Sequence, residues 1–225
     1  MLFIIGTIFA SFTQVIAHRY AQQTQTSHRS MCHHCHQQLY WYHLIPILSY
    51  ILTTGKCTFC KKRIPFYYPC MECLGGLLAL FLPHCNTSYT LILIAFFIFA
   101  QIDLEYQIVP NIWQGLYFIV TLLYCAIPHH RFYISILMLF LYVIIDKHLP
   151  NKIGGADVKL LLITYLNIGM LSTMYILLYA SIFALLYMCI KHRFKQSIAF
   201  VPFLCLGACL HSYLLFIHNL YPLIH

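Results

Sequence analysis

Two aspartates at the edges of apolar runs are the residues here whose type and placement could do chemistry. Asp103 closes the run LILIAFFIFAQID, and Asp157 opens the run VKLLLITYL after Gly154 and Gly155. The chain has only five acidic residues among 225, and ionisable groups at the edge of a membrane span are costly enough to be functional candidates. Two facing carboxylates can share a proton and hold a water, one as general base and the other as acid. That is the chemistry of an aspartyl protease.

The glycines before Asp157 would favour this chemistry, because glycine allows another backbone to approach closely. A peptide must reach the carboxylates in extended form, since a helix hides its amide bonds. The alternative is structural: each aspartate caps its helix or pairs with a lysine such as Lys159, and Gly154 and Gly155 form a tight turn. The residues alone leave both interpretations open.

Two C-x-x-C pairs form a second candidate site, in the polar segment 18–69. Cys32 and Cys35 make the first pair, Cys57 and Cys60 the second, and residues 36–56 separate them. Four thiolates at such spacing are typical of a tetrahedral structural zinc site. Basic residues beside the second pair would offset the charge of the bound thiolates.

Other uses of these cysteines must be weighed. They could form the redox relay of a membrane thiol oxidoreductase, or they could be plain buried residues. Three histidines crowd the first pair, and His33, His34 or His36 could replace one cysteine as a ligand, although four thiolates already complete a closed site. The polar surroundings favour metal over burial, and a reducing cytoplasm disfavours disulfides.

The composition indicates an all-α integral membrane protein. Hydrophobic residues make up 61% of the chain and charged residues 8%, against about 25% charged in soluble domains. A span needs about 20 apolar residues, and eight candidate spans can be read, the first of them a true span and not a removed signal. They are 1–17, 70–83, 88–102, 112–127, 132–145, 158–169, 171–190 and 198–218.

The basic residues predict the orientation of these spans. Lysine and arginine accumulate in cytoplasmic loops. With both termini outside, all 13 basic residues except Arg131 fall on the cytoplasmic side. This arrangement places the cysteine loop and both aspartates at the cytoplasmic face of a multi-pass protein of the cell membrane. It also explains the net charge of +8 without nucleic acid as a partner.

Taken together, these motifs resemble the bacterial type IV prepilin peptidase family, membrane aspartyl proteases named for a Gly-x-Gly-Asp motif. The resemblance extends over most of the chain, and several long motifs occur in the family's order. They are ASFTQVIAHR (10–19), MCHHC (31–35), HLIPILSYILTTGKCTFCKKRIPFYYPCMECLGG (43–76), IDLEYQIVPN (102–111), GGADVKL (154–160) and IAFVPFLCLGA (198–208).

The resemblance implies the function. Asp103 and Asp157 fall on the family's two catalytic aspartates, and Gly154, Gly155 and Lys159 stand beside the second one. Such enzymes cut the short basic leader from prepilins or pseudopilins after a glycine at the cytoplasmic face of the bilayer. Many then N-methylate the new N-terminus with S-adenosylmethionine, whose binding residues stay unknown. Members of the late-competence type serve DNA uptake, and others serve pili or type II secretion.

This chain departs from the family's pattern at a few positions. Ala156 precedes Asp157, where the family has glycine. A left-handed alanine would cost roughly 1–2 kcal/mol, so we expect that the position needs a small side chain and not left-handed geometry. Ala10 and Gln14 stand where glycine and asparagine are common, which bears on the first span more than on proteolysis.

The sequence predicts two parts with different tasks. Residues 1–86 would hold the first span, the four-cysteine zinc loop and the second span, and residues 87–225 would form the membrane-embedded aspartyl peptidase core. Two functions from other classes compete with this one. A metal or proton transporter would require acidic residues or histidines in the middle of its spans. A membrane thiol oxidoreductase would require its cysteines on the outer face of the membrane.

Overall fold

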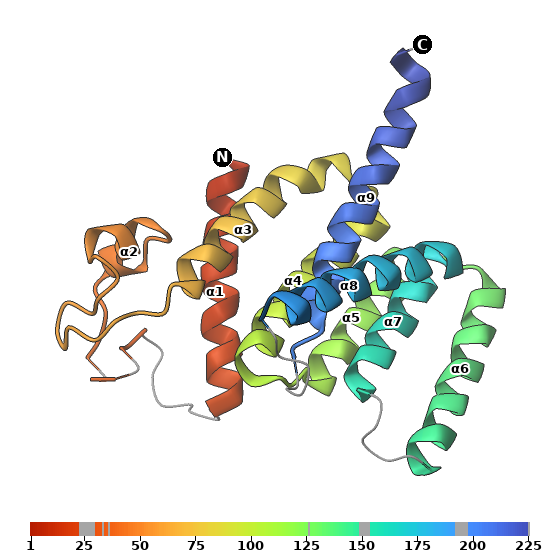
Figure 1. Cartoon of the computed structure of the whole chain (residues 1–225), viewed down its shortest axis with the longest axis horizontal. Helices are drawn as coiled ribbons and strands as arrows, with labels where there is room; N and C mark the ends of the chain where they lie inside the picture. Colours follow the sequence, from red (N-terminus) through yellow and green to blue (C-terminus); the bar gives the residue numbers. More distant parts are fainter. Residues whose placement is uncertain are drawn as a thin grey trace. The chain divides into compact units, whose positions relative to one another are not determined.

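The computed structural model describes residues 1–22, 30–32, 34–35, 37–125, 127–148, 154–191 and 198–224. Over these ranges the chain is helical, and β pairing is limited to two isolated bridges, Met31–Gln38 and Lys56–Arg63. The expected all-α class is therefore confirmed. The chain divides into two compact units, Met1–Pro83 and His84–His225 (Figure 1).

The first unit contains a packed helix pair and a loop. Helix α1 (Leu2–Gln22) packs along α3 (Tyr67–Phe81), and between them in the chain lie the short helices η1 (Trp41–Leu44) and α2 (Leu48–Leu52). The pair approaches closely at Gly6, where an added Cβ would collide with the carbonyl oxygen of Gly75. Gln14 Nε2 donates to the carbonyl oxygen of Tyr68 at 3.3 Å. The two helices therefore run in opposite directions.

The second unit is built around α4 (Thr87–Tyr106), which follows the short helix η2 (Leu82–His84). Helix α4 is buried around most of its circumference, and Ile92, Leu93 and Phe96 are among its buried residues. It contacts α9, α5 and α7, while α8 packs on α9 and α7, and α6 packs on α7. The remaining helices are α5 (Asn111–Tyr124), α6 (His129–His148), α7 (Gly155–Ile168), α8 (Met170–Lys191) and α9 (Val201–Ile224).

Local chemistry explains where several helices end. Helix α4 closes at Gln107, whose backbone is left-handed and whose N–H donates to the carbonyl oxygen of Asp103 at 2.9 Å. Pro110 then precedes α5, in keeping with proline's inability to continue a helix. Helix α7 ends at Gly169, at φ +86, a conformation that glycine adopts without steric cost.

Each run that the sequence marks as a span overlaps one of the helices α1 and α3–α9. Four helices in the described ranges, α1, α4, α8 and α9, are long and apolar enough to cross a membrane. Helix α6 contains a shorter apolar stretch, and α3, α5 and α7 have 15, 14 and 14 residues, below the usual length of a span. The four helices support a membrane location, and a count of eight spans stays a prediction.

Candidate active site and cysteine cluster

Asp103 is buried in the last turn of α4 and is fixed by a helix distant in sequence. Its side chain is 7% exposed. One carboxylate oxygen, Oδ2, accepts the backbone N–H of Val201 at 3.1 Å. Val201 is the first residue of α9, where backbone N–H groups have no partner within the helix. The start of α9 therefore supplies both a hydrogen bond and the positive end of a helix dipole to this carboxylate.

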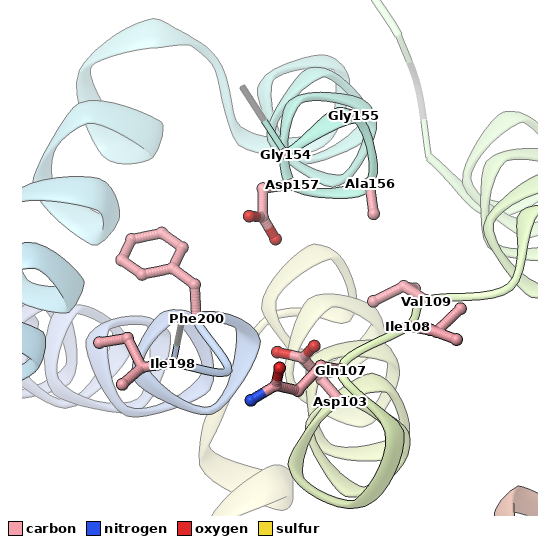
Figure 2. Close-up of a pocket in the computed structure, with 10 residues that line it drawn as sticks. All are labelled: Asp103, Gln107, Ile108, Val109, Gly154, Gly155, Ala156, Asp157, Ile198 and Phe200. Carbon is pink, nitrogen blue, oxygen red and sulfur yellow. The ribbon is translucent and has the colours of Figure 1, made fainter. Parts of the chain in front are cut away.

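Asp157 lies in the first turn of α7. The preceding Gly154 has extended backbone, with φ −61 and ψ 102, and the helix begins at Gly155. Figure 2 shows the side chain of Asp157 directed from α7 into the same space that the carboxylate of Asp103 faces. The two residues therefore come together in the fold, and their common depth in a membrane stays a prediction.

The two aspartates line one pocket of about 390 Å³ within the second unit (Figure 2). Its walls combine the end of α4, the loop after it, the start of α7 and the segment before α9. The lining residues are Asp103, Gln107, Ile108, Val109, Gly154, Gly155, Ala156, Asp157, Ile198 and Phe200. A pocket that combines two carboxylates with apolar side chains suits an extended peptide with apolar side chains beside the reacting bond.

The glycines act here through their size. Neither Gly154 nor Gly155 has a positive φ. A Cβ on Gly154 would lie 2.7 Å from Oδ2 of Asp157, and one on Gly155 would collide with the hydroxyl of Tyr142. Ala156 lies inside α7, and it is not among the described residues with positive φ, so this position does not use left-handed geometry.

The structural interpretation of the site would pair Lys159 with one of the two aspartates, but its side chain binds a different residue. Its Nζ donates to Oδ1 of Asn111 at 3.0 Å, and Asn111 is the first residue of α5. The bond joins α7 to α5 next to the pocket. Lys159 as a supporting residue of the site stays a prediction, and nothing in the sequence pattern pointed to Asn111, 48 positions away.

The four cysteines of the two pairs come together in the first unit. The sulfurs of Cys32, Cys35, Cys57 and Cys60 all lie within 4.8 Å of one another, and those of Cys32 and Cys60 are 3.9 Å apart. Four sulfurs at about 2.3 Å from a tetrahedral zinc ion would be about 3.8 Å apart. The cluster therefore fits a structural zinc ion.

Two tight turns bring the sulfurs together. In the first pair the N–H of Cys32 donates to the carbonyl oxygen of Gln37 at 3.0 Å, and in the second the N–H of Cys57 donates to that of Lys62 at 2.9 Å. Hydrogen bonding from the backbone of Cys60 lowers the pKa of the Cys57 thiol to about 7, which favours the thiolate that a metal requires.

The histidines expected as alternative ligands are only partly described. His33 and His36 lie outside the described residues. His34 is exposed, and its Nδ1 lies 3.5 Å from Nζ of Lys62. The metal cluster that the described residues form consists of the four cysteines and includes no histidine.

Glu72 has a role that sequence reasoning missed. Helix α3 begins at Tyr67, and Glu72 lies buried in its second turn. Its Oε2 accepts the N–H of Ile47 at 2.7 Å. Ile47 has a φ of +62, which is rare for a β-branched residue, so the bond holds an unusual backbone just before α2.

Comparisons with known proteins agree with this geometry. Residues 4–85 match the Bacterial Peptidase A24 N-terminal domain, and residues 90–189 match the Type IV leader peptidase family. The first range contains the four cysteines and the second contains Asp103 and Asp157. No solved structure matches the chain.

Three similar proteins carry the name prepilin leader peptidase/N-methyltransferase. The one from Vibrio cholerae is 25% identical over 209 residues, which cover 82% of this chain and 83% of that protein. The one from Bacillus subtilis is 31% identical over 71% of this chain and 69% of that protein. The one from Myxococcus xanthus is 34% identical over 48% of this chain and 35% of that protein. With both halves matched to domains of one enzyme class, the chain belongs to the type IV leader peptidase family.

Proposed function

We propose that this protein is a membrane aspartyl endopeptidase that removes the leader of prepilins or pseudopilins, with Asp103 and Asp157 as its catalytic pair. One observation carries the proposal: two carboxylates from different helices line one pocket inside the region that matches the peptidase family. The names of the similar proteins support the substrate class. Neither the family models nor these names describe a transporter or a thiol oxidoreductase.

The proposed reaction needs one carboxylate ionised and one protonated. The ionised carboxylate takes a proton from a water held between the pair, while the protonated one donates a hydrogen bond to the scissile carbonyl. The water oxygen bonds to the carbonyl carbon, and the C–N bond then breaks as the leaving nitrogen takes up a proton. Asp103, held by Val201, and Asp157, held at the start of α7, provide the fixed positions that this step requires.

The decisive experiment uses the purified chain in lipid nanodiscs with a candidate prepilin, read by mass spectrometry of the product. We expect loss of the leader up to a glycine, and loss of cleavage by at least about 100-fold in Asp103→Asn and in Asp157→Asn. These variants keep the size of the side chain and remove its acid–base function. Cleavage at the normal rate by either variant would exclude the pair as catalysts.

Methyl transfer is a second activity of the proposal, and it rests on the names of the similar proteins. S-adenosylmethionine would supply the methyl group, and we assign no residues to its binding. The same mass spectrum measures this activity, because a methyl group that replaces an N-terminal hydrogen makes the product heavier by one CH2 unit. A product that stays unmethylated with the donor present would remove this part of the proposal and leave the peptidase part intact.

We further assign a structural zinc ion to Cys32, Cys35, Cys57 and Cys60. The ion would tie the two turns of the loop together and take no part in peptide cleavage. Metal analysis of the purified protein should find one zinc per chain. Protein with no zinc and four free thiols would contradict this assignment.

The proposed topology has both termini outside and eight spans, with the cysteine loop and both aspartates on the cytoplasmic side. Residues 1–86 form the zinc-loop part and residues 87–225 form the peptidase core. The distribution of basic residues supports this orientation. Labelling of Cys32 and Cys57 by an impermeant thiol reagent, after metal removal, should occur only from the cytoplasmic side. Labelling of these thiols from outside would overturn the topology.

A further inference from the structure

The loop of the first unit exposes large apolar side chains that no described part of the unit covers. Trp41 in η1 is 76% exposed, and Ile51 and Leu52 in α2 are 63% and 74% exposed. Phe66, the residue before α3, is 69% exposed. We call this set of side chains the loop surface: Trp41, Leu48, Ile51, Leu52 and Phe66. Apolar side chains gathered in this way mark a contact with a partner or a membrane.

Several contacts within the first unit hold the loop surface in a defined structure. The ring of Tyr40 lies 6.0 Å from that of Phe59, next to the second cysteine pair. The ring of Tyr50 in α2 makes an edge contact with Phe66 at 6.0 Å. The N–H of Ile64 donates to the carbonyl oxygen of Gly55 at 2.8 Å. These contacts join η1, α2 and the segment before α3 to the cysteine turns.

Two hydrogen bonds tie the loop surface to the helix pair of the first unit. Gln14, within the apolar stretch Leu2–Arg19 of α1, binds the carbonyl oxygen of Tyr68, so α3 starts beside that stretch. Glu72, about 6 Å further along α3, holds the N–H of Ile47. Helix α2 is therefore tied, through α3, to a helix pair that contains a candidate span.

The positive charge of the segment that carries the loop surface favours anionic lipid. Residues 18–71 contain six basic residues and no acidic one. A zinc ion bound by four thiolates would carry two negative charges, which leaves four positive charges in excess. Lys56, Lys61, Lys62 and Arg63 are exposed and lie between α2 and Phe66 in the chain. Basic residues interleaved with tryptophan and tyrosine are typical of segments at an anionic membrane surface.

We propose that the loop surface is embedded in the headgroup layer of an anionic bilayer. Trp41, Ile51 and Leu52 contact the upper part of the acyl chains, and the basic side chains of the second cysteine turn bind lipid phosphates. A protein partner fits less well, because the bilayer is already present around the helix pair to which Glu72 and Gln14 tie the loop, and it supplies both the apolar and the anionic component.

Tryptophan quenching by labelled lipids in nanodiscs tests this placement. The chain has two tryptophans, so Trp113→Phe leaves Trp41 as the only reporter in the full-length protein, and Trp113→Tyr serves if that variant does not fold. Nanodiscs carry phosphatidylglycerol with a quencher either near the headgroup or near the end of the acyl chain. We expect Trp41 to be quenched by the shallow label more strongly than by the deep one. Absence of quenching by both labels, or stronger quenching by the deep one, would overturn the proposal.

A second arm tests the choice of anionic lipid. Lys61→Gln/Lys62→Gln removes two charges from the loop, and Lys147→Gln/Lys191→Gln removes two exposed charges elsewhere as a matched control. Each basic residue near an anionic surface favours adsorption about fivefold. Shallow quenching in phosphatidylglycerol should therefore exceed that in phosphatidylcholine, and only the loop variant should lose this difference. Equal quenching in both lipids, or loss in the control as well, would refute the part played by charge. Unchanged zinc content shows that the loop variant is folded.

Discussion

The carboxylate of Asp157 has almost no free space on the side of Gly154. Gly154 has a φ that any residue can adopt, so the reason for a glycine there is the 2.7 Å that would separate a new Cβ from Oδ2 of Asp157. The position is therefore constrained by the side chain of Asp157 and not by the turn. This makes it a test of how accurately the carboxylate must be placed.

We expect Gly154→Ala to lower leader cleavage by about 100-fold, because a displacement of about 1 Å can cost that much. Ala156→Gly is the matched control, since it removes a methyl group beside the same aspartate, and it should keep most of the activity. Rates are measured on one prepilin in nanodiscs. Normal cleavage by Gly154→Ala would mean that Asp157 has more freedom than its surroundings indicate.

Gly155→Ala should also lower leader cleavage, but through a contact with a different side chain. Its Cβ would meet only the hydroxyl end of Tyr142, the far end of a side chain. The loss of activity should therefore be smaller, and the double variant Gly155→Ala/Tyr142→Phe should recover it. If removing the hydroxyl restored nothing, the contact with Tyr142 would not be the cause of the loss.

The pH dependence of cleavage should reflect the pair and not either aspartate alone. At low pH both carboxylates are protonated and no base is left, and at high pH both are ionised and no acid is left. A plot of kcat/KM against pH should therefore rise and then fall. A rate that increased steadily through the alkaline range would contradict a shared proton.

At the scale of the elements, α8 and α9 touch through their backbones at Gly207. A Cβ there would lie 2.6 Å from the carbonyl oxygen of Ile176 and 3.0 Å from the amide nitrogen of Ala180. Backbone atoms cannot move aside as a side chain can. Small residues at such crossings are typical of helices packed in membranes.

Gly207→Ala should therefore destabilise the protein by about 1–3 kcal/mol, although alanine favours helix. Gly115→Ala in α5 is the matched control, because nothing lies within 4 Å of its Cβ position, and it should stabilise by about 0.5–1 kcal/mol. Thermal or denaturant unfolding in detergent measures both. Stabilisation by Gly207→Ala as well would show that α8 and α9 are further apart.

The positions of most helices could be predicted from the sequence. Apolar runs placed every long helix, because burial in lipid requires continuous apolar stretches. The meeting of Asp103 and Asp157 followed from charge asymmetry, which assigned both to one membrane face. The wall formed by Gln107, Ile198 and Phe200 could not be predicted, because polarity and periodicity do not determine which helix ends pack together. The same holds for the bond between Glu72 and Ile47.

At the scale of the whole molecule, the four-cysteine cluster and the pocket with the two aspartates lie in different units. Cys57→Ser should lose bound zinc and expose residues 30–66 to proteases, because a structural zinc site contributes about 10–16 kcal/mol of binding energy to folding. Leader cleavage should persist at a measurable rate, since both aspartates belong to the other unit. Cys189→Ser, at an exposed thiol of α8, is the control. Retention of zinc by Cys57→Ser would rule out this cysteine as a ligand.

The hydrogen bond from Val201 to Asp103 has a consequence for the order in which activity is acquired. The two residues are 98 positions apart, and the donor belongs to α9, which follows both aspartates in the chain. During synthesis, the ribosome has delivered both aspartates to the membrane before the segment that fixes the first one has emerged. The bond that positions Asp103 can therefore form only after α9 has been made, so this contact of the site is completed late in synthesis.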